Sequence, residues 1–555
     1  MQTNNTWRSQ TKQTGAWGGL LLGILFFLWL YGAAILNPAE TGWMLHGDPA
    51  QHYLGWEFFR REPWSLPLGR IENFGAPLTA SIVFTDSLPL LAIPLKLLSP
   101  WLPETFQYFG AWMLLCHALT GWFAWRIFSR LGLGVAASAL GTLLMLLMPA
   151  MMLRAYGHES LMAHWLILAA IDRYLAGWSG RGWLALVLLA AAVHAYLLAM
   201  LLAIFCAAWL RAVAVDRTLS LVQGGARAAL GALLLGGWMA LLGYFVGATK
   251  QLAAEGYGHY SANLLTWFDP MDWRAFLLHY GRDPAGKGEW SHFLPALGQT
   301  TAGQYEGFAY LGAGLLLLAG IALVSVLRRR QRLPGFMLPL LAVALALFIA
   351  ALSNRVSLGG RELFAVPLSD TMLGMLSIFR ASGRFVWPLT YLAAIAAVVV
   401  VARQWPARAA VPLLALAVLV QTLDMNGKLR EFRDKFHRPA AYQNPLADPL
   451  WESAAQRHRR IVVYPAEVTG GDWIPFARLA ALSGASINVS NVARADEQGR
   501  LEAAAALEAE IASGALRPDT LYVLRDAGIA REFHVKGPAR MRQMDGYTVF
   551  FLEGI

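Results

Sequence analysis

The stretch that decides the fold is residues 183–210, WLALVLLAAAVHAYLLAMLLAIFCAAWL, which contains no charged residue. A helix that crosses a membrane needs about 20 apolar residues. These 28 residues are therefore long for one crossing and short for two. His194 and Tyr196 interrupt the apolar run near its middle. The number of crossings in this stretch sets the side of the membrane on which every later loop lies.

The composition places most of the chain in a membrane. Of its 555 residues, 57% are hydrophobic and 14% are charged, whereas soluble domains carry about 25% charged residues. This excludes a soluble enzyme with one core and a disordered chain. A net charge of +10 can indicate a nucleic-acid partner. No run here alternates basic and aromatic residues, so we expect no nucleic acid and assign the surplus to cytoplasmic loops.

Nine other segments are apolar enough to be predicted as spans. They are 16–36, 106–128, 133–152, 160–176, 228–248, 308–327, 334–352, 385–402 and 409–424. The first follows Arg8 and Lys12 and has no convincing cleavage site, so we predict a retained span rather than a signal peptide. Cys116 and Cys206 both lie in apolar segments and indicate neither a disulfide nor a metal pair.

The positions of the basic residues decide how many times residues 183–210 cross the membrane. With the N-terminus in the cytoplasm, a single crossing would put the basic clusters 211–227 and 328–332 outside, against the positive-inside rule. Two crossings return both clusters to the cytoplasm. We therefore predict two short helices broken near His194, and eleven spans in all. Such a break is tolerated only where the backbone faces protein or a water-filled cavity.

The predicted fold is mainly α, a polytopic membrane protein with a small α/β domain outside the membrane. Residues 1–423 form the membrane domain, with a long first outer loop at 37–105, and residues 424–555 form the outer domain. The outer domain has strand-like runs at 461–464, 520–524 and 547–552 around a helix at 499–513. It contains neither a dinucleotide-binding nor a P-loop fingerprint.

Two acids of the first outer loop are candidate catalytic residues. Asp48 lies in HGDPAQHY (46–53), and Asp86 lies in FTDSLP (84–89). A carboxylate beside a partly apolar cavity has a raised pKa and can act as a general base towards a hydroxyl. The alternative for each acid is a helix N-cap, because both precede helical or apolar runs.

A metal site at the same place is a weaker alternative. His46 and His52 could join Asp48, but the spacing of the histidines matches no HExxH-like pattern. We predict no metal and no other cofactor.

Further polar residues are expected at the outer ends of the spans. His158 and Glu159 open the fourth span, and His194 and Tyr196 lie at the predicted break. Polar groups at membrane depth are functional by default, with interfacial anchoring as the alternative.

The motif FRASGRF, residues 379–385, carries two arginines at the outer end of a later span. Arg380 and Arg384 suit phosphate binding, with snorkelling at the membrane surface as the alternative. Glu306 is a further outer acid, and Asn263 is a candidate hydroxyl-binding amide.

The layout resembles the C-type (GT-C) integral membrane glycosyltransferases. The shared features are a first span, a long outer loop with Gly-Asp48, many spans with a broken pair and an outer C-terminal domain. The phrases YGHESLMAHW (156–165), GHYSANLL (258–265), YEGFAYLG (305–312) and FRASGRF are similar to a bacterial branch of that superfamily.

The resemblance implies a transferase of the bacterial inner membrane. It would move a sugar from a polyprenyl-phosphate donor to a cell-envelope glycan or lipid acceptor on the periplasmic face. Asp48 is then the general base. Many members carry a pair of acids here, whereas Pro49 and Ala50 follow Asp48 in this chain. This departure leaves Asp86 as the best second acid.

The remaining candidates are assigned to the two substrates. Donor phosphate binding is assigned to Arg380, Arg384, His158, His194 and Tyr196, and acceptor or sugar binding to Glu159, Asn263, Glu306 and His52.

Two other functions compete with glycosyl transfer. A transporter or flippase of a lipid-linked glycan fits the spans, but transporters usually show internal repeats and no matching halves are found here. A non-catalytic assembly protein would tolerate substitution of Asp48 and Arg384.

Overall fold

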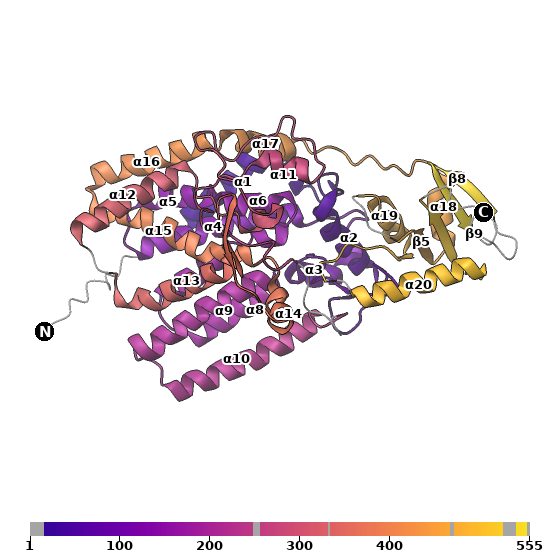
Figure 1. Ribbon diagram of the computed structural model, residues 1–555, viewed down its shortest axis with the longest axis horizontal. Helices are drawn as coiled ribbons and strands as arrows, with labels where there is room; N and C mark the ends of the chain where they lie inside the picture. The colour runs from indigo at the N-terminus through magenta and orange to yellow at the C-terminus, as the bar shows by residue number, and fades with distance from the viewer. Residues whose placement is uncertain are drawn as a thin grey trace.

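The computed structural model describes residues 16–247, 256–330, 333–466, 471–494, 496–525 and 540–551. Arg8 and Lys12 lie outside these residues. Figure 1 shows an elongated molecule, with a helical bundle at one end and a small sheet domain at the other. The predicted fold class, mainly α with a small α/β domain, is confirmed.

Every segment predicted as a span contains helix. The bundle helices are α1 (Trp17–Tyr31), α4 (Phe109–Arg130), α5 (Val135–Leu146), α6 (Pro149–Leu153), α7 (Trp165–Leu175), α8 (Gly180–Ala191), α9 (Ala195–Leu210), α10 (Leu221–Leu242), α12 (Ala313–Arg329), α13 (Leu338–Leu352), α15 (Trp387–Gln404) and α16 (Ala407–Asp424). Six helical stretches of the described chain are long and apolar enough to cross a membrane. The count of eleven crossings therefore stays a prediction.

The predicted break in 183–210 is confirmed, because α8 ends at Ala191 and α9 begins at Ala195. Leu90 N–H donates to the Ala192 carbonyl at 2.8 Å, and the Tyr244 hydroxyl donates to the Ala191 carbonyl at 2.7 Å. Neighbouring protein thus satisfies the carbonyl groups that the broken helix leaves free. His194 lies at the tip of the resulting hairpin.

Contacts between helix ends show that basic residues gather at one end of the bundle. α4 begins at Phe109, whose ring stacks on His52, and ends at Arg130, which pairs with Asp172 of α7 at 2.9 Å. Arg211, after α9, donates to the Tyr174 carbonyl of α7 at 2.7 Å. The arginine-rich ends therefore lie away from the first outer loop, as the charge pattern predicted.

Shorter elements cover the other end of the bundle. They are α2 (Gly47–Arg61), β1 (Arg70–Ile71), β2 (Ala80–Ser81), α3 (Pro89–Leu97), α11 (Trp273–His279), β3 (Arg355–Leu358), β4 (Arg361–Ala365), α14 (Asp370–Leu376) and α17 (Asn426–His437). α17 packs on α1, with the Phe436 ring 5.1 Å from the Tyr31 ring. The region predicted to begin the outer domain at residue 424 thus opens with a helix that packs on the bundle.

The C-terminal domain has one five-stranded sheet in the order β6-β5-β7-β9-β8. Its elements are α18 (Leu450–Arg457), β5 (Arg460–Tyr464), α19 (Ile474–Ser483), β6 (Ser486–Ile487), α20 (Glu497–Ser513), β7 (Thr520–Leu524), β8 (Arg540–Met544) and β9 (Tyr547–Phe551). β5 pairs in parallel with β6 and β7, and β9 is antiparallel to β7 and β8. Gly75 N–H donates to the Ile487 carbonyl at 2.9 Å, which joins the domain to the first loop.

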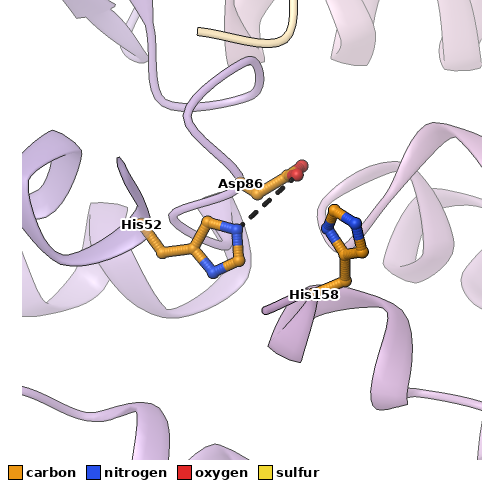
Figure 2. A group of neighbouring side chains, drawn as sticks. All are labelled: His52, Asp86 and His158. Atoms are coloured by element: carbon orange, nitrogen blue, oxygen red, sulfur yellow. Dashed lines mark ion pairs between the residues drawn. The ribbon is translucent and has the colours of Figure 1, made fainter. Parts of the chain in front are cut away.

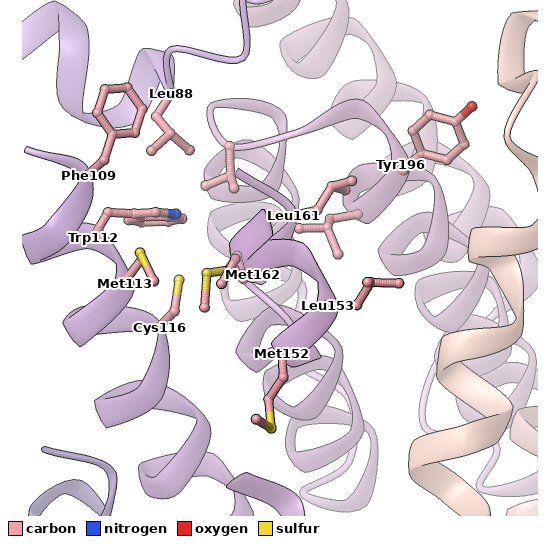
Figure 3. Close-up of a cluster of buried hydrophobic side chains, with 14 of the residues drawn as sticks. Leu88, Phe109, Trp112, Met113, Cys116, Met152, Leu153, Leu161, Met162 and Tyr196 are labelled. Atoms are coloured by element: carbon pink, nitrogen blue, oxygen red, sulfur yellow. The ribbon is translucent and has the colours of Figure 1, made fainter. Parts of the chain in front are cut away.

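A buried apolar cluster fixes the segment that carries His158. Figure 3 shows Met113 and Cys116 of α4 facing Met162. In the same cluster, the Trp112 indole donates a 2.8 Å hydrogen bond to the Glu159 carbonyl. The irregular turn before α7 is therefore held against a rigid helix.

A topology reporter tests the arrangement of the hairpin. Because α8 and α9 form an antiparallel pair and Arg211 joins the arginine-rich end, a reporter fused after Ala214 should be active in the cytoplasm. Activity of the same fusion in the periplasm would contradict two crossings of 183–210.

Candidate active site

Asp48 lies in the first turn of α2 and is not an N-cap. The N-cap residue is His46, and no side chain caps this helix. The Asp48 side chain is 53% exposed, so the carboxylate is open to a substrate. Gly157 lies next to Asp48, and a Cβ atom there would be 3.3 Å from the Asp48 Cβ. Glycine at 157 leaves room for the aspartate.

Asp86 has an unusual backbone conformation for a residue with a side chain, with φ of +56°. This left-handed region is strained for most residues, and such strain gathers at functional sites. Asp86 does not cap α3, whose N-cap is Leu88 and has no side-chain cap. The buried Ser87 hydroxyl donates to the His52 carbonyl at 2.8 Å. The strained turn is thus held against α2.

His52 lies between two carboxylates. Its Nδ1 is 2.7 Å from Glu159 Oε2, and its Nε2 is 3.8 Å from Asp86 Oδ2. Burial disfavours the imidazolium, but Glu159, Asp86 and Asp48 outweigh it and raise the pKa of His52. Glu159 is fully buried. Its predicted role in acceptor binding gives way to holding His52 in place.

His158 and His194 complete the group. His158 Nε2 is 3.9 Å from Asp48 Oδ2, and His194 Nε2 is 3.5 Å from Asp86 Oδ1. Figure 2 shows that Asp86 and the rings of His52 and His158 converge on one space. Burial lowers the pKa of His158 well below its usual range, so this ring is neutral.

These side chains could also hold a metal ion. One ligand atom each from His52, Asp86 and His158 lie within 4.8 Å of one another. Two imidazoles and a carboxylate suit a divalent transition metal. The hydrogen bond from His52 to Glu159 is the kind of support that orients metal-binding histidines. The prediction of no metal therefore needs a direct test.

Glu306 is not available to an acceptor. Its Oε2 is 2.6 Å from Arg154 Nη1 and 2.9 Å from Arg384 Nε, and its Oε1 pairs with Arg384 Nη2. All three side chains are at least nine-tenths buried. Burial opposes ionisation, but the two arginines hold the pKa of Glu306 well below its usual range. The predicted roles of Glu306 and Arg384 as direct ligands are corrected to a buried ion-pair cluster.

Arg380 differs from Arg384. Its guanidinium lies over the Tyr260 ring at 5.6 Å, and among the described residues no carboxylate pairs with it. Tyr196 lies between the two arginines, since its hydroxyl accepts a 2.8 Å hydrogen bond from Ala381 N–H and Arg384 lies 4.6 Å over its ring. Arg380 therefore remains a candidate phosphate ligand, while Tyr196 positions the FRASGRF turn.

Asn263 lies apart from these groups, and its amide is fully engaged. Its Nδ2 donates to the Gly359 carbonyl at 2.9 Å, and its Oδ1 accepts from Leu265 N–H and Gly359 N–H at 3.0 and 2.9 Å. The expectation that Asn263 binds a hydroxyl is corrected, because this amide fixes the turn after β3.

Three basic residues near the acids were not among the sequence candidates. Arg154 is buried under Glu306. Arg282 and Lys435 approach the Asp48 side of the site. Arg154 lies beside the YGHES motif and could have been found there. The other two come from distant segments with no motif.

A groove of 1080 Å³ runs between the first loop and the C-terminal domain, along α20. It reaches Phe84, two residues before Asp86. Three arginines of its lining pair with carboxylates, in Arg70–Glu72, Arg500–Glu497 and Arg517–Glu510. The groove is polar but close to neutral at these positions.

The family of the chain follows from sequence models. A family described as "Domain of unknown function (DUF6311)" matches residues 20–426, and its C-terminal domain, described as "DUF6311 C-terminal domain", matches residues 450–552. The chain belongs to this family. Residues 427–449, which hold nearly all of α17, lie between the two matches. No curated protein matches the chain.

Two solved structures share a distant likeness with this DUF6311 chain. One is the archaeal oligosaccharyltransferase AglB from Archaeoglobus fulgidus in complex with an inhibitory peptide and a dolichol-phosphate. It is 12% identical with a TM-score of 0.41, and the match covers 93% of this chain and 70% of that one. The other is the apo form of the Archaeoglobus fulgidus oligosaccharyltransferase, with 12% identity, a TM-score of 0.41 and coverage of 92% and 70%.

Two acid-to-amide variants should separate a structural acid from a site acid. Glu306→Gln leaves two buried arginines without a counter-charge and should destabilise the protein by about 3 to 5 kcal/mol. Asp48→Asn removes a half-exposed charge and should change stability by less than about 0.5 kcal/mol. Thermal unfolding of the purified protein in detergent measures both. Equal midpoints for the two variants would contradict the assignment of Glu306.

Proposed function

We propose that the protein is a membrane glycosyltransferase. It transfers a sugar from a polyprenyl-phosphate donor to a glycan or lipid acceptor of the cell envelope, on the periplasmic face of the bacterial inner membrane. The observation that carries the proposal is the convergence of Asp48 and Asp86 with three histidines at the end of an apolar bundle opposite its arginine-rich end. An acid–base centre beside a lipid phase suits a substrate with a lipid tail.

Asp48 is the general base in this mechanism. The protein around the half-exposed Asp48 carboxyl partly desolvates it and raises its pKa above the ordinary value of 3.8, against the opposing charges of His52 and Arg282. A base whose pKa is closer to the working pH accepts a proton more effectively. Asp48 takes the proton of the acceptor hydroxyl while the oxygen bonds to the anomeric carbon. The bond from that carbon to the phosphate oxygen breaks, and a single displacement inverts the anomeric centre.

Asp86 and His52 support this reaction beside Asp48. Burial also raises the pKa of Asp86. The protonated His52 offers positive charge close to the reacting carbon, and Asp86 keeps that charge in place. Stabilisation of developing charge by preorganised groups is usually the largest contribution to such catalysis.

The donor phosphate is assigned to Arg380. This arginine follows α14, where Met372 and Met375 are more than half exposed, as suits a segment in contact with lipid tails. Arg154 and Arg384 around the single charge of Glu306 leave one net positive charge behind the site. Phosphate on the departing polyprenyl chain would therefore meet positive potential.

The acceptor is assigned to the groove along α20. The groove has a volume of 1080 Å³, three of its arginines pair with carboxylates, and Phe84 in its lining lies two residues before Asp86. A neutral, polar and half-apolar lining suits the two faces of a sugar chain.

Replacing the base tests the function. Asp48→Asn should lower sugar transfer from a polyprenyl-phosphate monosaccharide by about 100-fold or more, while donor binding and expression stay unchanged. Glu104→Gln, which changes an exposed acid of the same loop, is the matched control. Unchanged transfer in Asp48→Asn would refute the assignment. Lipid movement across vesicles without any transfer would instead favour a flippase.

The pH dependence has a defined sign. The pKa of Asp48 is raised above 3.8, so the base is lost as pH falls through this raised value. The acid limb of kcat/KM should therefore lie at higher pH than for an ordinary aspartate. Arg282→Gln removes a charge that lowers this pKa and should move the limb higher still. A limb that does not move in Arg282→Gln would count against Asp48 as the titrating base.

Chelation tests whether sugar transfer needs a divalent metal ion. If a divalent ion binds, His52, Asp86 and His158 would hold it and it would neutralise charge on the donor phosphate. We expect transfer to survive EDTA, because the raised pKa of His52 favours the protonated ring, which can itself supply positive charge. Loss of transfer in EDTA that manganese restores would overturn this expectation.

A further inference from the structure

Two cations that form no ion pair with a described residue lie near the start of α2, the helix that carries Asp48. They are Arg282, after α11, and Lys435, in α17, and among the described residues no carboxylate pairs with either side chain. Both act on His46, whose pKa burial and these two charges lower to about 4. Arg282 also acts on Asp48, whereas Arg384 acts on Asp86. The site therefore has a second group of positive charges, distinct from that around FRASGRF.

The end of α11 fixes the place of Arg282. Gly281 has φ of +65°, its N–H donates to the Leu278 carbonyl at 3.0 Å, and Arg282 N–H donates to the Leu277 carbonyl at 2.8 Å. This pattern is a Schellman cap, which favours glycine at the left-handed position. The cap directs Arg282 towards α2, where its Nη2 lies 3.1 Å from the place of a Cβ on Gly47.

An anchored helix fixes the place of Lys435. Lys428 of α17 is fully buried, pairs with Glu431 at 2.8 Å and lies 4.0 Å over the Trp273 ring. Lys435 follows seven residues later, on the same face of the helix. Its Nζ lies 4.8 Å over the ring of Tyr156, two residues before His158. Burial lowers the pKa of Lys435 to about 8, so its charge is poorly hydrated.

Comparison with Lys428, the other lysine of α17, shows that Lys435 has no close ion-pair partner in the described part of the chain. Lys428 has a carboxylate within 2.8 Å, whereas among the described residues Lys435 forms no ion pair and lies over the aromatic faces of Tyr156 and Phe436, with Glu159 and Glu431 acting on it from farther away. Lys435 is half-buried and Arg282 is exposed, and it is the buried cation that usually has a close partner. An anion that binds between Lys435 and Arg282 would supply that partner next to the base.

We propose that Arg282 and Lys435 bind a phosphate group of a substrate beside Asp48. An arginine fork and a lysine point charge together suit the oxygens of a phosphate. The inference rests on the proposed transferase function and deepens it. The phosphate belongs either to the lipid donor or to a phosphorylated acceptor, and both present the same oxyanion to this pair.

Binding of inorganic phosphate to the purified full-length protein tests the subsite without any turnover. Arg282→Gln and Lys435→Gln should each weaken phosphate binding, measured by calorimetry, by about tenfold, as expected when one charge-assisted hydrogen bond is lost. Lys435→Arg should retain binding. Arg274→Gln on α11 and Arg430→Gln on α17 are matched controls, because both arginines are exposed and lie on the same two elements.

A second titration with a polyprenyl phosphate identifies the source. A parallel loss of affinity for this lipid in Arg282→Gln and Lys435→Gln assigns the phosphate to the donor. If these variants keep their affinity for the lipid while their affinity for phosphate falls, the phosphate belongs to the acceptor. If the double variant binds phosphate as tightly as the wild type and both controls, the proposal is wrong. Transfer by Asp48→Asn is a separate measurement, so failure of the subsite and failure of the transferase function can be distinguished.

Discussion

Glu306 is buried between Arg154 and Arg384, and these three residues come from parts of the chain more than 70 positions apart. A carboxylate in such a place is stable only with its partners, because an unpaired buried charge is strongly unfavourable. The ion pairs therefore tie the turn before α7, the turn before α12 and the FRASGRF turn into one unit. His158, whose Nε2 is 3.8 Å from Glu306, is set by the same cluster.

The first outer loop adds the other half of the site. Asp48 and His52 are one helical turn apart on α2, and Asp86 returns to them through a strained turn held by Ser87. Glu159 reaches across from the bundle to His52 at 2.7 Å. The first outer loop and the bundle thus share buried polar contacts as well as an apolar core. Neither of them forms the candidate active site alone.

The charges divide into those with partners and those without. Arg154, Arg384 and Lys428 form ion pairs within the fold and hold it together, while among the described residues Arg380, Arg282 and Lys435 form no ion pair. The proposed binding of a phosphate-bearing substrate therefore rests on these three individual side chains and not on the net charge of +10.

Local pattern was sufficient for the helices, the break at His194 and the strands of the outer domain, since hydropathy and positive charge act over short stretches. It also singled out Asp48, Asp86 and His158. It could not separate Arg380 from Arg384, because only the distant Glu306 decides which of the two is free. Likewise the sequence does not show that the Asn263 amide forms hydrogen bonds with the backbone of Gly359. The sequence by itself determined an apolar chain with its basic ends on one side. Tertiary structure decided which polar groups pair inside and which face a substrate, because long-range ion pairs leave no trace in local periodicity.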